Sequence, residues 1–309
     1  MRNAFAEEVT ALADQYPELV LLSGDIGNRL FDKFKARHPK RFYNVGVAEQ
    51  NMTSVAAGMA MAGLRPITYT ITAFATVRCL EQIRVDVCYH HQPVIIVGVG
   101  AGLSYASLGG THHACEEVAM LRALPDMTVV CPGDPLEVKL ALRAAVEWKR
   151  PLYLRMGKKG EPKVHTQTPH FVIGKAIVIK PGTEVCLLGN GTLLSATAGA
   201  GERLAQNKIS AEVASFHTVK PLDEAYLKDV FSRFSVVAAV EEHSRLGGLG
   251  GAIAEGLSDQ PPQKAKFLRI GTEDRFIHEA GEQEHALERL GLTSEGIAAT
   301  VEKALRAAR

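Results

Sequence analysis

The feature that most constrains this chain is the alternation of short, wholly apolar runs with segments of helical periodicity. The run Pro93 to Gly98, for example, has no polar alternation, which is typical of a strand covered on both faces of a parallel sheet. Segments with helical spacing of apolar residues lie between such runs, as at Leu80 to Val87 and Leu136 to Trp148. Strands that alternate with helices predict an α/β fold with a doubly wound parallel sheet. The apolar runs of the first half are Leu19 to Leu22, Ile67 to Ile71, Val94 to Val99, Met127 to Cys131 and Leu152 to Arg155.

A polar stretch interrupts this alternation and predicts two domains. Residues Gly157 to Pro169 are rich in Gly, Pro and Lys and show no apolar periodicity, which indicates a linker. We therefore expect one doubly wound domain over residues 1–160, a linker over 161–171 and a second doubly wound domain over 172–309. The second domain is expected to have strands at Glu184 to Gly189, Ser210 to Ser215, Ser235 to Glu241 and Ala265 to Ile270, and helices near Leu193 to Gln206, Asp223 to Phe234, Gly248 to Leu257 and Ser294 to Ala307.

The amino-acid composition argues against nucleic acid and membranes as binding partners. Lys and Arg together number 35 against 34 Asp and Glu, so the chain carries no basic surplus of the kind that binds nucleic acid or an anionic membrane. The five cysteines are scattered without metal-ligand spacing, which indicates reduced core residues of a cytoplasmic protein. We expect neither a signal peptide nor a membrane-spanning segment, because no apolar run is long enough.

One carboxylate lies at a predicted strand-to-helix junction. The segment up to Val45 suits a strand, Gly46 permits a sharp turn, and Glu49 then falls in the first turn of a helix of small residues. A helix dipole tolerates a carboxylate there, so Glu49 is either a helix cap or a group that faces a ligand at the strand end.

Other candidate residues also follow predicted strands. Ligands of open parallel sheets bind beyond the carboxyl ends of the strands, where the Gly-rich segment Gly100 to His113 carries His112. A histidine there can donate to a substrate hydroxyl or move a proton. Phe74 opens a predicted helix with Arg78 one turn later, and Arg155 ends a strand, where it is either a phosphate clamp or a member of an ion pair.

A second Gly-rich turn, Gly247 to Gly251, opens a predicted helix in the second domain. Its backbone is able to cradle a phosphate, but no Lys-Ser or Lys-Thr pair follows it. Close packing of the helix is the interpretation that we favour.

Taken together, these segments resemble the carboxyl-terminal half of transketolase and of 1-deoxyxylulose-5-phosphate synthase, which are thiamine-diphosphate enzymes. The resemblance extends over nearly the whole chain, and several ordered motifs at family spacing are more specific than any one of them. It implies a pyrimidine-binding domain followed by a transketolase C-terminal domain. The matching segments are Phe42 to Met52, Met61 to Ile67, Arg78 to Ile83, Gly110 to His112, Leu121 to Met127, Val219 to Asp223 and Val240 to His243.

The resemblance also implies a missing half. Single-chain transketolases carry an amino-terminal domain with a Gly-Asp-Gly segment and an Asn ligand that bind the diphosphate through Mg²⁺, and this sequence has no such segment. We therefore expect the second subunit of a split transketolase that needs a separate diphosphate-binding subunit, which would hold most of the metal contacts. The expected assembly has two copies of each subunit around a twofold axis and includes self-association through the pyrimidine domain.

Family roles then fall on particular residues. By resemblance, Glu49 bonds to the aminopyrimidine ring of the cofactor and activates it, and Phe74 lies near the aromatic residue that stacks on that ring. His112 matches the histidine that contacts the substrate. Arg155 and Arg78 match arginines that hold a sugar phosphate, and Arg78 also lies where it can contact the cofactor. No residue in this chain is expected to ligate a metal ion, and none in the second domain is assigned a catalytic role.

One position departs from the family pattern. Transketolases have an aspartate shortly before the Thr-His pair that contacts a substrate hydroxyl, and this chain has Leu108 in its place. A buried hydroxyl that faces a leucine would lose a partner at a cost of about 1 to 3 kcal/mol. The substitution therefore indicates a substrate other than an ordinary pentose phosphate, unless His113 or Tyr105 replaces the missing group.

Three alternatives remain at this level. The beta subunit of a 2-oxo-acid dehydrogenase shares Glu49 and the segment Met61 to Pro66, although Gly110 to His112 fits a transketolase better. A carboligase like 1-deoxyxylulose-5-phosphate synthase is a second alternative. A scaffold or regulatory subunit without catalysis is the third, and the complete motif around Glu49 argues against it.

Overall fold

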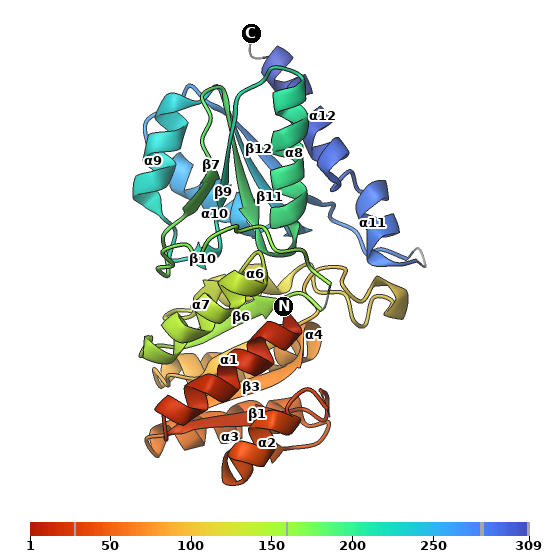
Figure 1. The fold of residues 1–309 in the computed structure, drawn as a ribbon. Helices are drawn as coiled ribbons and strands as arrows, with labels where there is room; N and C mark the ends of the chain where they lie inside the picture. The colour runs from red at the N-terminus through yellow and green to blue at the C-terminus, as the bar shows by residue number, and fades with distance from the viewer. Residues whose placement is uncertain (28, 159, 279–280, 308–309) are drawn as a thin grey trace.

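The computed structural model describes residues 1–27, 29–158, 160–278 and 281–307. It contains two sheets of mostly parallel strands, each covered by helices on both faces (Figure 1). The predicted α/β class with two doubly wound units is therefore confirmed. Among the described residues no helix has the length and apolar character needed to cross a membrane.

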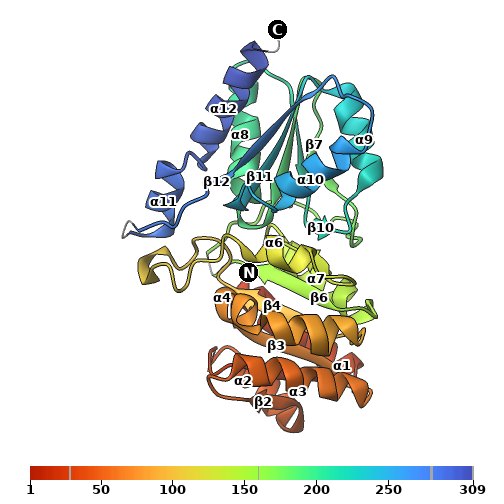
Figure 2. The same ribbon diagram turned by 180° about the vertical axis from the view of Figure 1, so that it is seen from behind.

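The first sheet has the strand order β10-β5-β6-β4-β3-β1-β2, and only β10 runs antiparallel to its neighbour. Helices α1 and α7 cover one face, whereas α3, the π-helix η3 and α6 cover the other, as the opposite views in Figures 1 and 2 show. The strands are β1 (Leu19–Ser23), β2 (Phe42–Asn44), β3 (Arg65–Ile71), β4 (Ile95–Val99), β5 (Thr128–Val130), β6 (Leu152–Met156) and β10 (Thr218–Lys220). The helices are α1 (Arg2–Gln15), α2 (Asp32–Arg37), α3 (Glu49–Met61), α4 (Thr72–Ala75), α5 (Leu80–Gln82), η3 (Ile83–Tyr89), α6 (Glu117–Arg122) and α7 (Pro135–Glu147).

The second sheet has the order β12-β11-β8-β9-β7, with β7 antiparallel at one edge. Helices α8 and α12 pack on one face, and α9 and α10 pack on the other. The strands are β7 (Ile177–Lys180), β8 (Val185–Asn190), β9 (Ala211–Ser215), β11 (Val236–Ser244) and β12 (Lys266–Thr272). The helices are α8 (Leu194–Gln206), α9 (Glu224–Arg233), α10 (Leu249–Ser258), α11 (Gln283–Arg289) and α12 (Ser294–Arg306).

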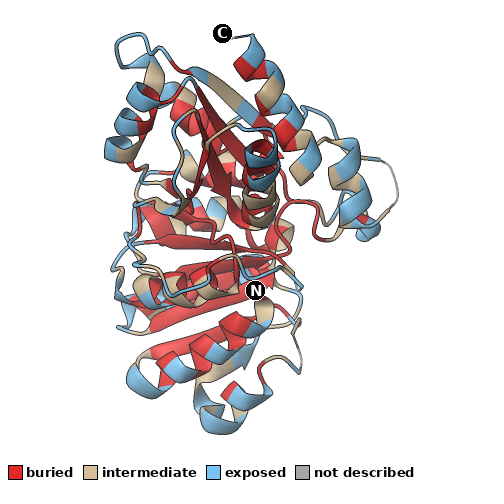
Figure 3. Cartoon of the chain, turned by 45° about the horizontal axis from the view of Figure 1, so that its top comes forward, coloured by how far each residue is buried: buried red, intermediate tan, exposed pale blue. Residues whose placement is uncertain are grey.

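Both sheets are buried along most of their length. Every residue of β1, β4, β8 and β11 is buried, which agrees with the absence of polar alternation in their sequences (Figure 3). All five cysteines are buried free thiols, in agreement with their apolar settings. Burial raises the pKa of the Cys131 thiol to about 12, so this thiol is inert at neutral pH.

The two units are joined more closely than the sequence predicts. Strand β10 belongs to the second half of the chain, yet it pairs with β5 and extends the first sheet. One apolar cluster also continues across the boundary, from Met52 and Ile83 through Cys131 to Leu188 and Phe231. The sheets therefore share part of their core, and the strand ends of one unit lie against the other.

Candidate active site

Glu49 is presented by a turn between β2 and α3. The chain leaves β2 at Asn44, turns at Gly46 with φ +72°, and begins α3 at Glu49 itself. The side chain is only 2% exposed. A Cβ added to Gly24, at the end of β1, would lie 3.4 Å from the Glu49 Cγ and 3.0 Å from the Thr70 Oγ1, so this glycine makes room for both side chains.

The buried carboxylate has two side-chain donors. Arg78 Nη1 donates to Glu49 Oε2 at 2.9 Å, and the Thr70 hydroxyl donates to Oε1 at 3.4 Å. Thr70 lies on β3, whereas Arg78 lies on the short turn after α4 and is 42% exposed. Glu49 is therefore paired with a cation that remains in contact with solvent, rather than used as a cap for its own helix.

A row of planar groups extends from this ion pair. The Arg78 guanidinium lies over the Phe74 ring at 4.3 Å from its centroid. The Phe74 ring meets the His112 ring edge to face at 5.2 Å, and His112 meets Tyr105 in the same way at 6.1 Å. Glu49, Arg78, Phe74 and His112, which the sequence places on three separate segments, thus come together at one end of the first sheet.

His112 is half-buried within this row. Burial lowers the pKa of His112, and the neighbouring His113 lowers it further, so the imidazole is neutral at pH 7. Its Nδ1 lies 2.9 Å from the Thr111 hydroxyl oxygen. A neutral imidazole both donates and accepts a hydrogen bond, which suits a group that exchanges a proton with a sugar hydroxyl.

His113 lies apart from this row. Its Nε2 is 3.4 Å from the Ala106 carbonyl oxygen, and the residue lines a separate pocket of 270 Å³ against residues 272–277. Leu108 is 54% exposed at the outer turn of the same loop. Tyr105, rather than His113, is therefore the residue of this loop that accompanies His112.

Arg155 does not fit the predicted phosphate clamp, and this expectation is corrected. The side chain is 1% exposed, and its Nε donates to Glu117 Oε1 at 2.5 Å. Burial alone would lower the pKa of Arg155, but the Glu117 carboxylate keeps it raised. The ion pair that the sequence offered as the alternative is present, but in the interior rather than on the surface.

Three residues near the row were missed or undervalued by sequence reasoning. Thr70 carries no motif signal, because a threonine in an apolar strand is ordinary. The sequence indicates Tyr105 only as a replacement for an absent aspartate. Lys158 lies over the Tyr105 ring with its Nζ 4.8 Å from the centroid, and its sequence carries no signal because it falls in the polar stretch that indicates a linker. A cation on an aromatic ring is the signal that only the structure supplies.

One observation indicates that the side chains at this site suit the aminopyrimidine ring of thiamine diphosphate. The Arg78 guanidinium is a planar N–H donor that stacks on Phe74 and bonds to the Glu49 carboxylate at the same time. An aminopyrimidine needs the same two kinds of contact, an aromatic face and a carboxylate. Arg78 thus occupies an acceptor and an aromatic face that match what such a ring requires. Within residues 1–27, 29–158, 160–278 and 281–307 no cluster of three His, Cys, Asp or Glu has the arrangement of a metal site.

The Gly-rich turn of the second domain, Gly247 to Gly251, is occupied by a side chain of the same domain. The Glu241 carboxylate accepts from the Leu249 N–H at 2.7 Å and from the Gly250 N–H at 2.8 Å. A Cβ on Gly248 would lie 2.1 Å from Glu241 Oε2, so the glycine permits this close approach. The amides that a phosphate would need are therefore already bonded, in agreement with a packing role for the turn.

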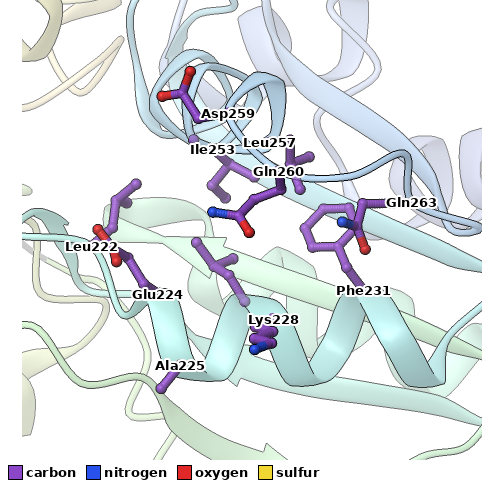
Figure 4. A pocket seen from close by; sticks show the side chains of 12 residues that line it. Leu222, Glu224, Ala225, Lys228, Phe231, Ile253, Leu257, Asp259, Gln260 and Gln263 are labelled. Atoms are coloured by element: carbon purple, nitrogen blue, oxygen red, sulfur yellow. The ribbon is translucent and has the colours of Figure 1, made fainter.

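A further pocket of 450 Å³ lies between α9 and α10, on the second domain alone (Figure 4). Apolar side chains such as Phe231 and Ile253 form part of its lining, together with Lys228 and Asp259. None of the predicted site residues lines it, so it is separate from the row that contains Glu49.

Comparisons with known proteins identify the family of this chain. The family model described as transketolase, pyrimidine binding domain matches residues 1–162, and the model described as transketolase, C-terminal domain matches residues 174–297. One of the subunits of the apulose-4-phosphate transketolase of Phocaeicola vulgatus is 31% identical over 97% of this chain and 95% of its own length. The 6-deoxy-6-sulfo-D-fructose transketolase subunit SqwH of Clostridium sp. is 34% identical over 96% of this chain and 92% of its own length.

A solved structure described as a split gene transketolase, inactive beta4 tetramer, is also similar. It shares 33% identity and a TM-score of 0.89 over 100% of this chain and 98% of its own. The chain therefore belongs to the transketolase family, whose enzymes depend on thiamine diphosphate. Its relatives of similar length are separate subunits of split transketolases, which makes this chain a subunit of that type.

Proposed function

We propose that this chain supplies the cofactor-activating side of a split transketolase that transfers a two-carbon ketol unit from a ketose phosphate to an aldose. The observation that supports this most directly is the buried Glu49 carboxylate, which is connected through Arg78 to the Phe74 ring, with His112 against that ring. A separate subunit would bind the diphosphate and hold the Mg²⁺, because the residues of this chain provide only the pyrimidine side.

Each residue then has a defined task. Thiamine diphosphate, when bound, supplies a carbon nucleophile and an electron sink for cleavage next to a carbonyl group. Glu49 Oε2, the oxygen that now accepts from Arg78, would share a proton with a ring nitrogen of the aminopyrimidine, while Thr70 donates to Oε1. Phe74 offers a stacking face. His112 donates a proton to, or accepts one from, a substrate oxygen.

The anionic end of the substrate needs a cation other than Arg155. Lys158 lies beside Tyr105 at the far end of the row, and we assign it the role of binding a phosphate or a comparable anion. Leu108 is exposed next to this region and leaves no carboxylate to bind a substrate hydroxyl. We infer that the substrate differs from an ordinary pentose phosphate at the position that the family's aspartate contacts.

Large apolar side chains on the first domain support association with other subunits. Val47 is 76% exposed, Tyr89 77% and Met61 54%, and these residues lie on or next to α3 and η3. Exposed apolar residues on and next to these two helices are typical of a surface that another chain covers. We propose a partner subunit and a second pyrimidine domain as the covering chains.

The experiment that tests this function combines the purified chain with a diphosphate-binding transketolase subunit, thiamine diphosphate and Mg²⁺. Ketol transfer is followed with a panel of ketose phosphate donors and aldose acceptors. Glu49→Gln should fold and assemble but lose turnover by about 100-fold or more, since it cannot hold the proton in the same way. Glu18→Gln, at the opposite end of β1, is the matched control and should retain activity.

Two results would contradict the proposal. Near-normal turnover by Glu49→Gln would reject the role of this carboxylate, and full activity of the chain without a second subunit would reject the split site. The same assay includes 2-oxo acids as donors. Decarboxylation of a 2-oxo acid with transfer to a lipoyl group would indicate a dehydrogenase beta subunit, and condensation of pyruvate with an aldose phosphate would indicate a carboligase.

A further inference from the structure

The loop that presents His112 is closed at its base. The backbone N–H of Gly102 donates to the Ala114 carbonyl at 2.9 Å, and the N–H of Ala114 donates back to Gly102 at 2.9 Å. Between these residues the chain carries Tyr105 and His112 away from the sheet. The position of the His112 ring therefore depends on how firmly this base is held.

The second domain provides a buried carboxylate at one side of the base. Glu242 lies near the end of β11 and is fully buried. Its Oε1 accepts from the Leu103 N–H at 2.7 Å and from the Gln283 amide at 2.8 Å, and its Oε2 accepts from the Thr192 hydroxyl. Leu103 is the loop residue directly after the closing bridge, so Glu242 fixes the start of the loop.

The other side of the base is tied to the same strand. Arg155 Nη2 donates to the Ala114 carbonyl at 2.8 Å and to the Glu242 carbonyl at 2.9 Å. The Ser244 N–H donates to the Cys115 carbonyl at 2.7 Å. The buried Arg155, which does not fit a phosphate clamp, thus connects β6 of the first sheet, the loop base and β11.

The underside of the loop also rests on the second domain. Leu103, Ala106 and Cys115 form a small apolar cluster. The cluster packs against Ile277 and Ala286. No space is left between the base and the carboxylate, because a Cβ on Gly102 would lie 2.5 Å from the Glu242 Cδ.

We propose that Glu242 is a positioning residue, by which the second domain holds the Gly102–Ala114 loop so that His112 faces the substrate. The inference rests on the proposed function for what His112 does, but the contacts that carry it are independent of that function. An apolar residue at this position would avoid the desolvation of a carboxylate. It would also leave the buried Leu103 N–H without an acceptor, and a misplacement of about 1 Å at a reacting group can cost about 100-fold in rate.

The test uses the full-length chain and two readouts. Hydrogen exchange measured by mass spectrometry reports the protection of peptides that cover residues 103–113, and the reconstituted enzyme gives kcat, the donor KM and the cofactor Kd. Glu242→Met removes the acceptor with little change of volume. Glu242→Gln keeps an oxygen for Leu103 and turns its amide toward the Thr192 hydroxyl. The control is Glu212→Met, which replaces another buried second-domain glutamate that bonds to Tyr226 and Arg233.

For Glu242→Met we expect exchange of the loop peptides to rise about tenfold or more and kcat to fall by about 10- to 100-fold. The donor KM should rise, while the cofactor Kd stays within about twofold, because the Glu49 side is untouched. Glu242→Gln should keep loop exchange and kcat close to the values of the parent chain. Glu212→Met should leave loop exchange and kcat unchanged even if the melting temperature drops.

Wild-type exchange of the loop in a folded Glu242→Met chain would overturn the proposal, as would equal acceleration by Glu212→Met. If Glu242→Met does not fold, Gly102→Ala tests the same contact from the loop side, and undisturbed exchange there would also overturn it. If the proposed function itself is wrong, the results differ: Glu49→Gln would remain active, whereas the effect of Glu242→Met on loop exchange would still be observed.

Discussion

The ends of the two sheets make opposite use of the same side chain. Both carry buried glutamates where strands give way to helices or loops, Glu49 in the first domain and Glu241 and Glu242 in the second. Glu49 is bonded to side chains, one of which is the half-exposed Arg78. Glu241 is bonded to backbone N–H groups of α10. Glu242 accepts from the backbone N–H of Leu103, in the loop that carries His112, and also from the side chains of Thr192 and Gln283.

The type of hydrogen-bond donor distinguishes a carboxylate that is available to a ligand from one that only stabilises the fold. A side-chain donor such as Arg78, which is 42% exposed, can rotate into solvent and be replaced by a ligand. A backbone donor cannot leave without unfolding its element. Polar residues at strand ends therefore mark a ligand site only where their partners are exchangeable, and the second domain shows the other outcome on a similar scaffold.

The largest effect on folding should follow from Glu241→Ala. The substitution leaves the N–H groups of Leu249 and Gly250 without an acceptor inside the protein, at about 1 to 3 kcal/mol each. We expect the free energy of unfolding in urea to fall by about 3 kcal/mol. The kcat of the reconstituted enzyme should stay within about twofold of the parent value. A stable variant that lost turnover would assign Glu241 to the site and erase the contrast between the two sheet ends.

A pH titration should distinguish the histidines of the two regions. His217 stacks on Phe171 at the joint between the sheets, and burial lowers its pKa to about 4. A lowered pKa means that the neutral ring stabilises the fold above the unfolded pKa of about 6.5, and that this contribution is lost as the pH falls toward 4. The loss should reach about 3 kcal/mol at most.

Unfolding in urea at a series of pH values measures this dependence. His217→Gln should flatten the stability profile between about pH 6.5 and pH 4, since glutamine does not titrate there. His112→Gln, at the half-buried row, is the paired variant and should leave most of the slope in place. The same steep profile in both variants would mean that the slope arises elsewhere.

The sequence predicted the features that depend on periodicity and on order along the chain. Apolar runs located the buried strands, and strand-end positions brought Glu49, Phe74, Arg78 and His112 to one edge. The edge strands β7 and β10 were missed because they have only four and three residues, so their formation depends on the neighbour that they pair with. The helix expected at Leu80 to Val87 is instead a short α-turn followed by the π-helix η3.

The sequence does not predict which group each buried polar side chain bonds to. Arg155 has the same local sequence whether it points to a phosphate or to Glu117, and only the folded structure shows that Glu117 of α6 is its partner. Likewise, Glu241 and Glu242 are adjacent in sequence, yet one caps a helix and the other holds a loop of the first domain. Alternate side chains of a strand point to opposite faces, which explains why neighbours serve different elements.

The smallest effect on stability should come from the site itself. Arg78→Met removes the guanidinium that bonds to Glu49 and lies over Phe74. Arg78 is half-exposed, so water is able to take its place beside the buried carboxylate. We expect Arg78→Met and Glu49→Gln each to change the free energy of unfolding by less than about 1 kcal/mol, and the double variant to show a coupling in the same range. Urea unfolding of the four chains measures this cycle. A coupling of several kcal/mol would show that Arg78 is as firmly fixed as the backbone donors of Glu241. Glu49 would then be a structural carboxylate like Glu241, rather than one that is available to a ligand.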